Sequence, residues 1–261
     1  MEKLITKKCK IIIMLYTLPL ILAFLAGIST LIGGLIVFLL RKTNFRYLCI
    51  SFGFSAGVMI FISFAELLTQ GIKATGFLYA ILSFFGGILI IYLIDVLIPH
   101  IYEEETYERK GGKLKRTAIL LLIGITIHNF PEGIAVFFSS VTNIKLGALV
   151  AIAIAMHNIP EGIAVSMPIF YASKDRKKAL LYSFLSGVAE PIGAVLSFFI
   201  LYKFLNEFIL GLILAAVAGI MVFISFDELL PYVYKHKNQH LSILGLFLGM
   251  FIISISIYLL S

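Results

Sequence analysis

Residues 56–68 read AGVMIFISFAELL and residues 218–230 read AGIMVFISFDELL, so ten of thirteen positions are identical. Between them lies a second pair, IHNFPEGIAV at 127–136 and MHNIPEGIAV at 156–165, with eight of ten positions identical. The shared Glu, Ser, His, Asn and Pro residues make chance similarity between apolar segments a poor explanation. The chain therefore contains an internal repeat.

The repeated stretches lie in a very apolar chain. Of 261 residues, 61% are hydrophobic and 13% are charged, and the mean hydropathy is +1.06. A soluble domain has about 25% charged residues, so an ordinary soluble globule and a disordered chain are both excluded. The apolar runs are continuous, whereas the strands of a membrane β-barrel alternate in segments of about ten residues. The composition indicates membrane-spanning helices.

Eight apolar segments are long enough for such helices, which need about 20 residues each. They lie approximately at residues 11–40, 45–69, 75–99, 117–141, 144–170, 179–202, 208–234 and 241–260. We therefore predict an all-α polytopic membrane protein, with residues 1–261 forming a single transmembrane domain and one strongly charged loop at 100–116.

The distribution of Lys and Arg predicts the orientation. The loops after segments 1, 3, 5 and 7 carry fourteen of these residues, and the N-terminal tail with the remaining loops carries seven. Because cytoplasmic loops are enriched in Lys and Arg, both termini are expected outside, although the four lysines of the N-terminal tail favour the reverse. Each repeat joins an even-numbered segment to an odd-numbered one, so its copies cross the membrane in opposite directions. Inverted repeats of this kind place a transport site near the midplane.

Several function classes are excluded or disfavoured. The net charge of +7 is explained by basic loops, so nucleic acid is not an expected partner. Cys9 and Cys49 form no CxxC pair, which disfavours a thiolate metal site. The chain has no GxxxxGK[ST] motif, so ATP hydrolysis is not the expected energy source.

Acidic residues inside the apolar segments are the informative ones. A charged side chain at the bilayer centre costs about 2.5–3.5 kcal/mol, so such residues must be paired, protonated, hydrated or bound to a cation. The alternative is that they only form hydrogen bonds between helices. The residues concerned are Glu66, Glu132, Glu161, Glu190, Asp227 and Glu228.

The HNFPEG motif places several ligand groups together. His128 and Glu132 are four residues apart, so they share one helix face. Asn129 offers an amide oxygen at a neighbouring position. Pro131 leaves the carbonyl of residue 127 without its usual donor and kinks the helix, and Gly133 allows another helix to approach.

HNIPEG repeats this arrangement at His157, Asn158 and Glu161, and Glu190 precedes Pro191 in a third kinked stretch, AEPIG. Imidazole, carboxylate and amide groups suit Zn, Fe, Mn, Co and Cd rather than Cu(I). The set is too large for one tetrahedral ion, so two adjacent ions sharing Glu132 and Glu161 are expected.

The remaining acidic residues lie near the ends of their segments. Glu66, Asp227 and Glu228 are candidates for the entrance and exit of a metal pathway, and Glu66 is also a candidate ligand. Pairing with Ser or backbone groups is the alternative for all three. Asp95 is expected to be interfacial.

HNFPEG and HNIPEG, together with SGVAEPIG and SFDELLP, closely resemble the motifs of the ZIP (Zrt/Irt-like) divalent-metal transporters, and are most similar to the bacterial ZupT-like branch. The resemblance covers essentially the whole chain. It implies eight helices in a 3+2+3 inverted repeat, both termini outside, and uptake of zinc or related divalent ions into the cytoplasm. It also implies that helices 1, 4, 5 and 6, or a similar group, move against the others.

The resemblance further implies a two-metal site with shared carboxylates. One ion would meet His128, Glu132, His157 and Glu161, and the other would meet Asn129, Glu132, Asn158, Glu161 and Glu190. Many family members carry Asp where Asn158 stands, so the second site is less charged here. The 100–116 loop has only His100 beside Glu103, Glu104 and Glu105 where many members have a run of histidines. A solvated charged loop is favoured over an ion-collecting one.

The sequence thus predicts a metal-ion transporter of the cell membrane, without a catalytic cofactor and without enzyme activity. An intramembrane metalloprotease is the first alternative, but it would use HExxH, and Asn and Glu stand at the second and fifth positions here. A metal sensor or channel is the second alternative. A homodimer is left open, as are the preferred metal and proton coupling.

Overall fold

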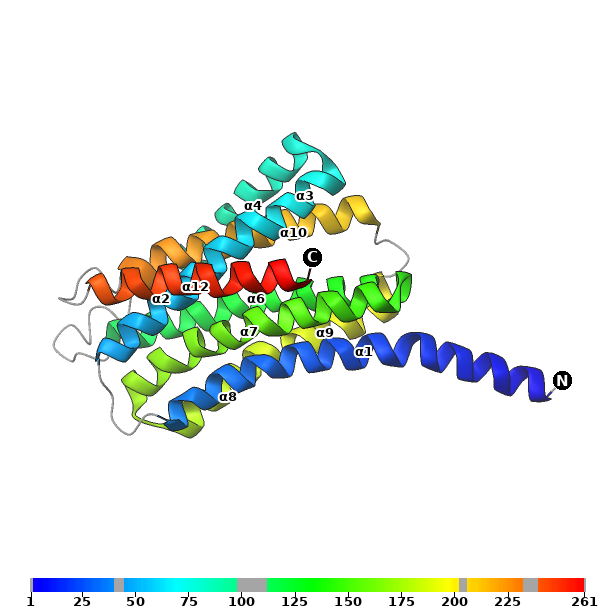
Figure 1. The fold of residues 1–261 in the computed structure, drawn as a ribbon, viewed down its shortest axis with the longest axis horizontal. Coiled ribbons are helices and arrows are strands. Elements are labelled where there is room, and N and C mark those ends of the chain that lie inside the picture. Colours follow the sequence, from blue (N-terminus) through cyan, green and yellow to red (C-terminus); the bar gives the residue numbers. More distant parts are fainter. Residues whose placement is uncertain (1, 40–44, 98–111, 202–205, 232–238, 261) are drawn as a thin grey trace.

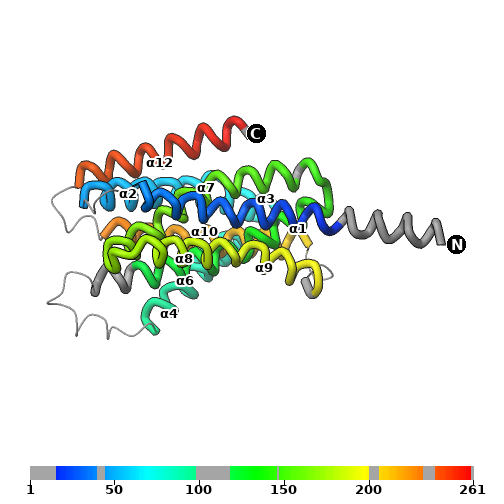
Figure 2. Tube along the Cα trace, turned by 90° about the horizontal axis from the view of Figure 1, so that it is seen from below, coloured from blue at the N-terminus to red at the C-terminus, as the bar shows by residue number. Residues whose placement is uncertain are grey.

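The computed structural model describes residues 2–39, 45–97, 112–201, 206–231 and 239–260. These residues are almost entirely helical, and eight of the helical spans are long and apolar enough to cross a membrane. The predicted all-α fold with eight membrane-spanning helices is confirmed. The helices lie side by side along the long axis of the molecule (Figures 1 and 2).

Five of the eight spans are single α-helices, and three contain a break or a π-helical turn. The single helices are α1 (Glu2–Leu39), α4 (Phe77–Leu97), α6 (Gly112–Thr142), α7 (Ile144–Ser173) and α12 (Gln239–Leu260). The second span joins α2 (Phe45–Ile62), the π-turn η1 (Ser63–Leu67) and α3 (Leu68–Thr75). The sixth joins α8 (Arg176–Gly187), α9 (Ala189–Leu196) and the π-turn η2 (Ser197–Leu201), and the seventh joins α10 (Glu207–Ile224) and the π-turn η3 (Ser225–Leu229).

Three helix ends within the described residues differ from the expected ones by five residues or more. The first helix, α1, begins at Glu2 rather than residue 11. The second span continues to Thr75 rather than residue 69, and it ends where Gly76 adopts a φ of 84°. Glycine is the residue that takes this conformation without steric penalty, so it sets the end of the helix. Residues 112–116 of the expected charged loop are helical, because α6 begins at Gly112 rather than residue 117. Residues 98–111 lie outside the described residues.

The helices fall into two groups that pack mainly within themselves (Figure 1). The α1 group contains α1, α6, α7, α8 and α9. The α2 group contains α2, α3, α4, α10 and α12. The two groups meet chiefly where α2 packs on α7 and where α10 packs on α6. The two HNxPEG motifs and Glu190 lie on helices of the α1 group.

Glycines set the closest contacts within each group. In the α2 group, Gly53 and Gly57 of α2 lie against the backbone of Ser242 and Leu246 in α12. Gly87 of α4 lies against the backbone of Ala216 in α10 in the same way. A Cβ atom at any of these positions would overlap a carbonyl group. Membrane helices use small residues to bring their backbones together in this manner.

We expect Gly87→Ala to lower the thermal unfolding midpoint of the detergent-solubilised protein. The new methyl group would collide with the carbonyl of Ala216, and overpacking of this kind costs about 1–3 kcal/mol. Gly86→Ala is the matched control, since no atom lies within 4 Å of the position its Cβ would take. Equal midpoints for the two variants would contradict the close α4–α10 contact.

Candidate metal centre

The first motif places an imidazole and a carboxylate on one face of α6. His128 and Glu132 are one turn apart, and His128 Nε2 lies 3.1 Å from Glu132 Oε1. Both side chains are buried. Pro131 lies inside the α-helix at this point. The predicted shared face of the HNFPEG motif is therefore present in the structure.

The second motif faces the first across α6 and α7. His157 Nε2 lies 2.6 Å from Glu132 Oε1, and His128 Nε2 lies 3.0 Å from Glu161 Oε1. Each histidine thus approaches the carboxylate of the other motif. One donor atom from each of His128, Glu132 and His157 lies within 4.8 Å of the other two, a spacing that allows them to hold one metal ion.

The two asparagines anchor the motifs to neighbouring helices. Asn129 Nδ2 donates to the carbonyl of Ser186 at 3.2 Å, and Asn158 Nδ2 donates to the carbonyl of Ala26 at 3.0 Å. Asn158 Nδ2 also hydrogen-bonds Glu190 Oε1. The amide nitrogens are thus used in hydrogen bonds, whereas the two Oδ1 atoms are buried without a hydrogen bond among the described residues.

Many donor atoms of the cluster are not used by one another. Glu132 Oε2, Glu190 Oε2 and both carboxylate oxygens of Glu161 are buried without a hydrogen bond within the described part of the chain. His128 Nε2 is close to two carboxylates but is not aligned for a hydrogen bond with either. A buried polar atom left without a partner costs about 1–3 kcal/mol. A bound cation would satisfy these oxygen and nitrogen atoms together.

Glu190 belongs to the same cluster. It is fully buried at the start of α9, and it interacts electrostatically with Glu132 and Glu161. The helix breaks just before it, since α8 ends at Gly187 and α9 begins at Ala189. Of the seven main residues that the sequence singles out, the structure brings six into contact or electrostatic interaction with one another: His128, Glu132, His157, Asn158, Glu161 and Glu190. The seventh, Asn129, is buried next to His128 on α6 and bonds Ser186. The roles of all seven as ligands remain a prediction.

The three other candidates lie elsewhere. Glu66 is half-buried in η1, where Gln70 Nε2 donates to its carboxylate at 3.3 Å. Asp227 and Glu228 lie in η3 and form a second acidic group with Asp95, with carboxylate oxygens within 4.8 Å of one another. The predicted role of the 100–116 loop concerns His100, Glu103, Glu104 and Glu105, which lie outside the described residues.

Sequence reasoning missed Asp95 as a partner of Asp227 and Glu228. It treated this residue as interfacial because it considered each apolar segment separately. The sequence shows only that Asp95 and the Asp–Glu pair lie at corresponding ends of segments three and seven, and the contact between α4 and α10 that brings them together is seen in the structure.

Eight membrane-spanning helices around a buried cluster of histidines, asparagines and glutamates define a membrane protein that handles metal ions. Comparison with known proteins agrees, because residues 104–257 match the ZIP zinc transporter family. The zinc transporter ZupT of Clostridium perfringens is 47% identical, over 92% of this chain and 94% of that protein. The zinc transporter ZupT of Streptococcus mutans is 48% identical, over 92% of this chain and 96% of that protein. The zinc transporter ZupT of Akkermansia muciniphila is 45% identical, over 90% of this chain and 94% of that protein.

The chain belongs to the ZIP zinc transporter family. The family resemblance predicted from the paired HNxPEG motifs is thereby confirmed, and the chain is a member of a transporter family rather than an enzyme.

We expect zinc to raise the thermal unfolding midpoint of the purified protein. A ligand that binds only the folded state at 100 times its Kd stabilises it by about 2.7 kcal/mol. His128→Ala and His157→Ala should abolish this zinc-dependent rise, because each removes one nitrogen of the cluster. His240→Ala is the control, since His240 is exposed at the start of α12. A full zinc response in both cluster variants would place the binding site elsewhere.

Proposed function

We propose that this protein transports zinc across the cell membrane into the cytoplasm. The observation that carries this proposal is the pairing of His157 with Glu132 and of His128 with Glu161 between two membrane-spanning helices. These groups lie far from any loop and retain unused donor atoms. Zinc accepts nitrogen and oxygen ligands of this kind, and the related proteins are named zinc transporters.

The transport site holds two ions in this proposal. Zinc is usually four-coordinate in proteins, so seven candidate ligands exceed what one ion needs. The first ion is bound by His128, Glu132, His157 and Glu161. The second is bound by Asn129, Glu132, Asn158, Glu161 and Glu190. The free Oδ1 atoms of both asparagines support this assignment.

The two halves of the chain are related as a 3+2+3 inverted repeat. Matching local structure supports this, because SFAEL at 63–67 and SFDEL at 225–229 both form π-helical turns. Matching contacts support it as well. In this repeat, spans 1, 2 and 3 correspond to spans 6, 7 and 8, and span 4 corresponds to span 5. The contact of span 2 with span 8 then corresponds to that of span 7 with span 3. The contact of span 1 with span 5 corresponds to that of span 6 with span 4.

Alternating access follows from the division into two groups. The α1 group carries all seven proposed ligands and moves as a unit against the α2 group. The limited contact between the groups, chiefly through α2 with α7 and α10 with α6, supports such a motion. The ion would lose its hydration shell at the midplane and regain it on the other side.

The orientation predicted from Lys and Arg assigns the remaining acidic residues to the two sides of the membrane. With both termini outside, the ends of α4 and α10 that carry Asp95, Asp227 and Glu228 face the cytoplasm, and Glu66 lies toward the outside. Glu66 then belongs to the entrance and the acidic group to the exit.

The nitrogen and oxygen ligands also allow Fe, Mn, Co and Cd. All seven ligands come from one chain, so transport does not require the homodimer, which stays an open prediction.

We expect purified protein in liposomes to take up zinc in a saturable manner. Glu132→Ala and Glu161→Ala should each reduce the uptake rate about tenfold or more, because loss of groups that support a metal has an effect of this size. Iron(II), manganese and cadmium are measured separately, and the order of their rates gives the ion preference. Glu207→Ala removes an exposed carboxylate at the start of α10 and serves as the control. Native uptake by both cluster variants would refute the proposed site.

We expect the Lys145 end of α7 to be outside and the Lys174 end to be inside. Both side chains are exposed, and they lie at opposite ends of α7. In a background without Cys9 and Cys49, Lys145→Cys should react with a membrane-impermeant maleimide on intact cells. Lys174→Cys should react only after permeabilisation. The opposite pattern would reverse the proposed orientation.

A further inference from the structure

Thr30 of α1 carries a hydroxyl group that the structure leaves unexplained. The side chain is fully buried, and its Oγ1 atom has no hydrogen bond among the described residues. The usual acceptor for a threonine in a helix is the carbonyl four residues earlier, here that of Ala26. That carbonyl already accepts from Ser29 Oγ at 2.6 Å and from Asn158 Nδ2 at 3.0 Å.

Several other helical hydroxyls in this protein do make the usual bond. Ser63 donates to the carbonyl of Met59 at 2.7 Å, and Thr75 donates to that of Gly71 at 2.9 Å. Among the described residues, Ser140 and Ser197 share with Thr30 a buried hydroxyl without a hydrogen bond. A buried hydroxyl without a partner is unfavourable, and the position of Thr30 in the repeat distinguishes it from these two serines.

The internal repeat relates Thr30 to Glu190. With an offset of 160, residues 19–37 and 179–197 show the same order of buried, half-buried and exposed positions, residue by residue. In this alignment Gly27 corresponds to Gly187 and Thr30 corresponds to Glu190. The first half of the chain thus has a threonine where the second half has a proposed metal ligand.

The backbone contacts follow the same correspondence. Gly162 of the second HNxPEG motif lies against the carbonyl of Thr30, and Gly133 of the first lies against the carbonyl of Glu190. The asparagine bonds match as well, since the acceptors Ala26 and Ser186 are also 160 residues apart.

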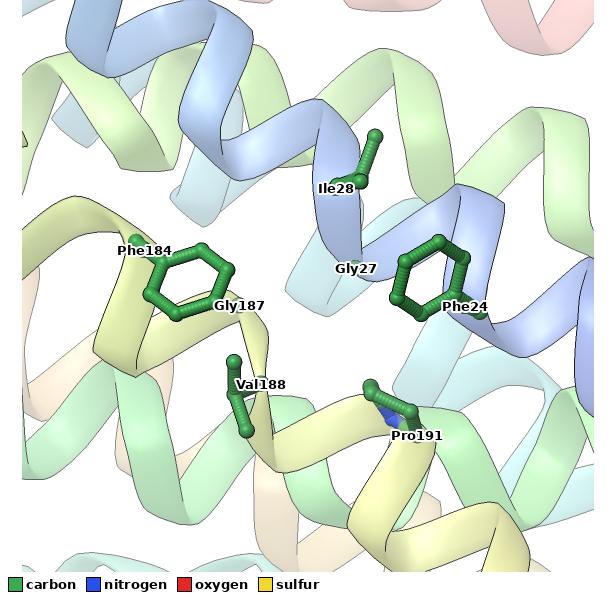
Figure 3. Close-up of a pocket in the computed structure, with 7 residues that line it drawn as sticks. All are labelled: Phe24, Gly27, Ile28, Phe184, Gly187, Val188 and Pro191. Carbon is green, nitrogen blue, oxygen red and sulfur yellow. The ribbon is translucent and has the colours of Figure 1, made fainter.

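Thr30 and Glu190 flank one helix crossing. Figure 3 shows Gly27 of α1 and Gly187 of α8 at this crossing, lining an apolar crevice. Thr30 and Glu190 lie close to these two glycines, since a Cβ built on Gly187 would lie 3.2 Å from Thr30 Oγ1, and one built on Gly27 would lie 3.3 Å from Glu190 Cβ. Ser183 Oγ donates to the Thr30 carbonyl at 2.7 Å and fixes this register.

We infer that Thr30 Oγ1 is an oxygen ligand of the second metal ion, opposite Glu190. The inference rests on the proposed two-ion function and adds a residue to it. A neutral hydroxyl oxygen offers the ion a further ligand without adding another buried negative charge. It also holds the ion less tightly than a further carboxylate would, which favours release during transport.

The test is zinc binding by the full-length protein in detergent, measured by titration calorimetry together with zinc uptake in liposomes. Thr30→Val removes the hydroxyl and keeps the shape, whereas Thr30→Ser keeps the hydroxyl. We expect T30V to weaken the second zinc ion about tenfold, as loss of a supporting group does, with the first ion unchanged. We expect T30S to retain both affinities.

Thr75→Val is the matched control, because Thr75 is a buried threonine whose hydroxyl is already bonded within its own helix. Native affinities in T30V, or equal weakening in T30V and T30S, would overturn the assignment of Thr30 while leaving the transport site intact. A native protein that binds fewer than two zinc ions or takes up none would instead refute the proposed function.

Discussion

The approach of His157 to Glu132, and of His128 to Glu161, is the interaction on which the rest of the structure depends. Each ionised carboxylate in the membrane interior costs about 2.5–3.5 kcal/mol unless it is paired or bound to a cation. The two motifs must therefore lie close enough for each to supply the partner of the other. This requirement fixes how α6 and α7 face one another, and it explains why the two motifs are so similar.

The same motifs also determine which helices surround the cluster. Gly133 admits the backbone of Glu190, and Gly162 admits the backbone of Thr30. The asparagine of each motif bonds a carbonyl on the span that the glycine of its own motif contacts. Asn129 bonds Ser186 on the sixth span, and Asn158 bonds Ala26 on the first. One short sequence thus encodes both the donor groups and the close helix contacts that enclose them, which is why the α1 group packs as a unit.

Much of this arrangement could be predicted from the sequence. Long apolar runs identify the eight spans, and the i, i+4 spacing of His128 and Glu132 places both on one helix face. Contacts between distant segments were harder to predict. The grouping of Asp95 with Asp227 and Glu228 depends on α4 packing against α10, and no local pattern reports it.

Local backbone detail was the second limit. The π-turns at Ser63–Leu67 and Ser225–Leu229 contain no Pro or Gly, so no helix-breaking residue within them marks the change from the α-helix. Thr30 was overlooked for a related reason. A threonine in a membrane helix normally bonds its own backbone, and only the structure reveals that Ala26 already has two other donors.

Anomalous X-ray scattering at the zinc absorption edge, recorded from crystals of the zinc-loaded protein, would locate a metal ion bound between the two HNxPEG motifs. We expect a strong zinc peak within about 2.0–2.2 Å of donor atoms of His128, Glu132 and His157. Zinc found only at other positions, such as the Asp95, Asp227 and Glu228 group, would contradict it.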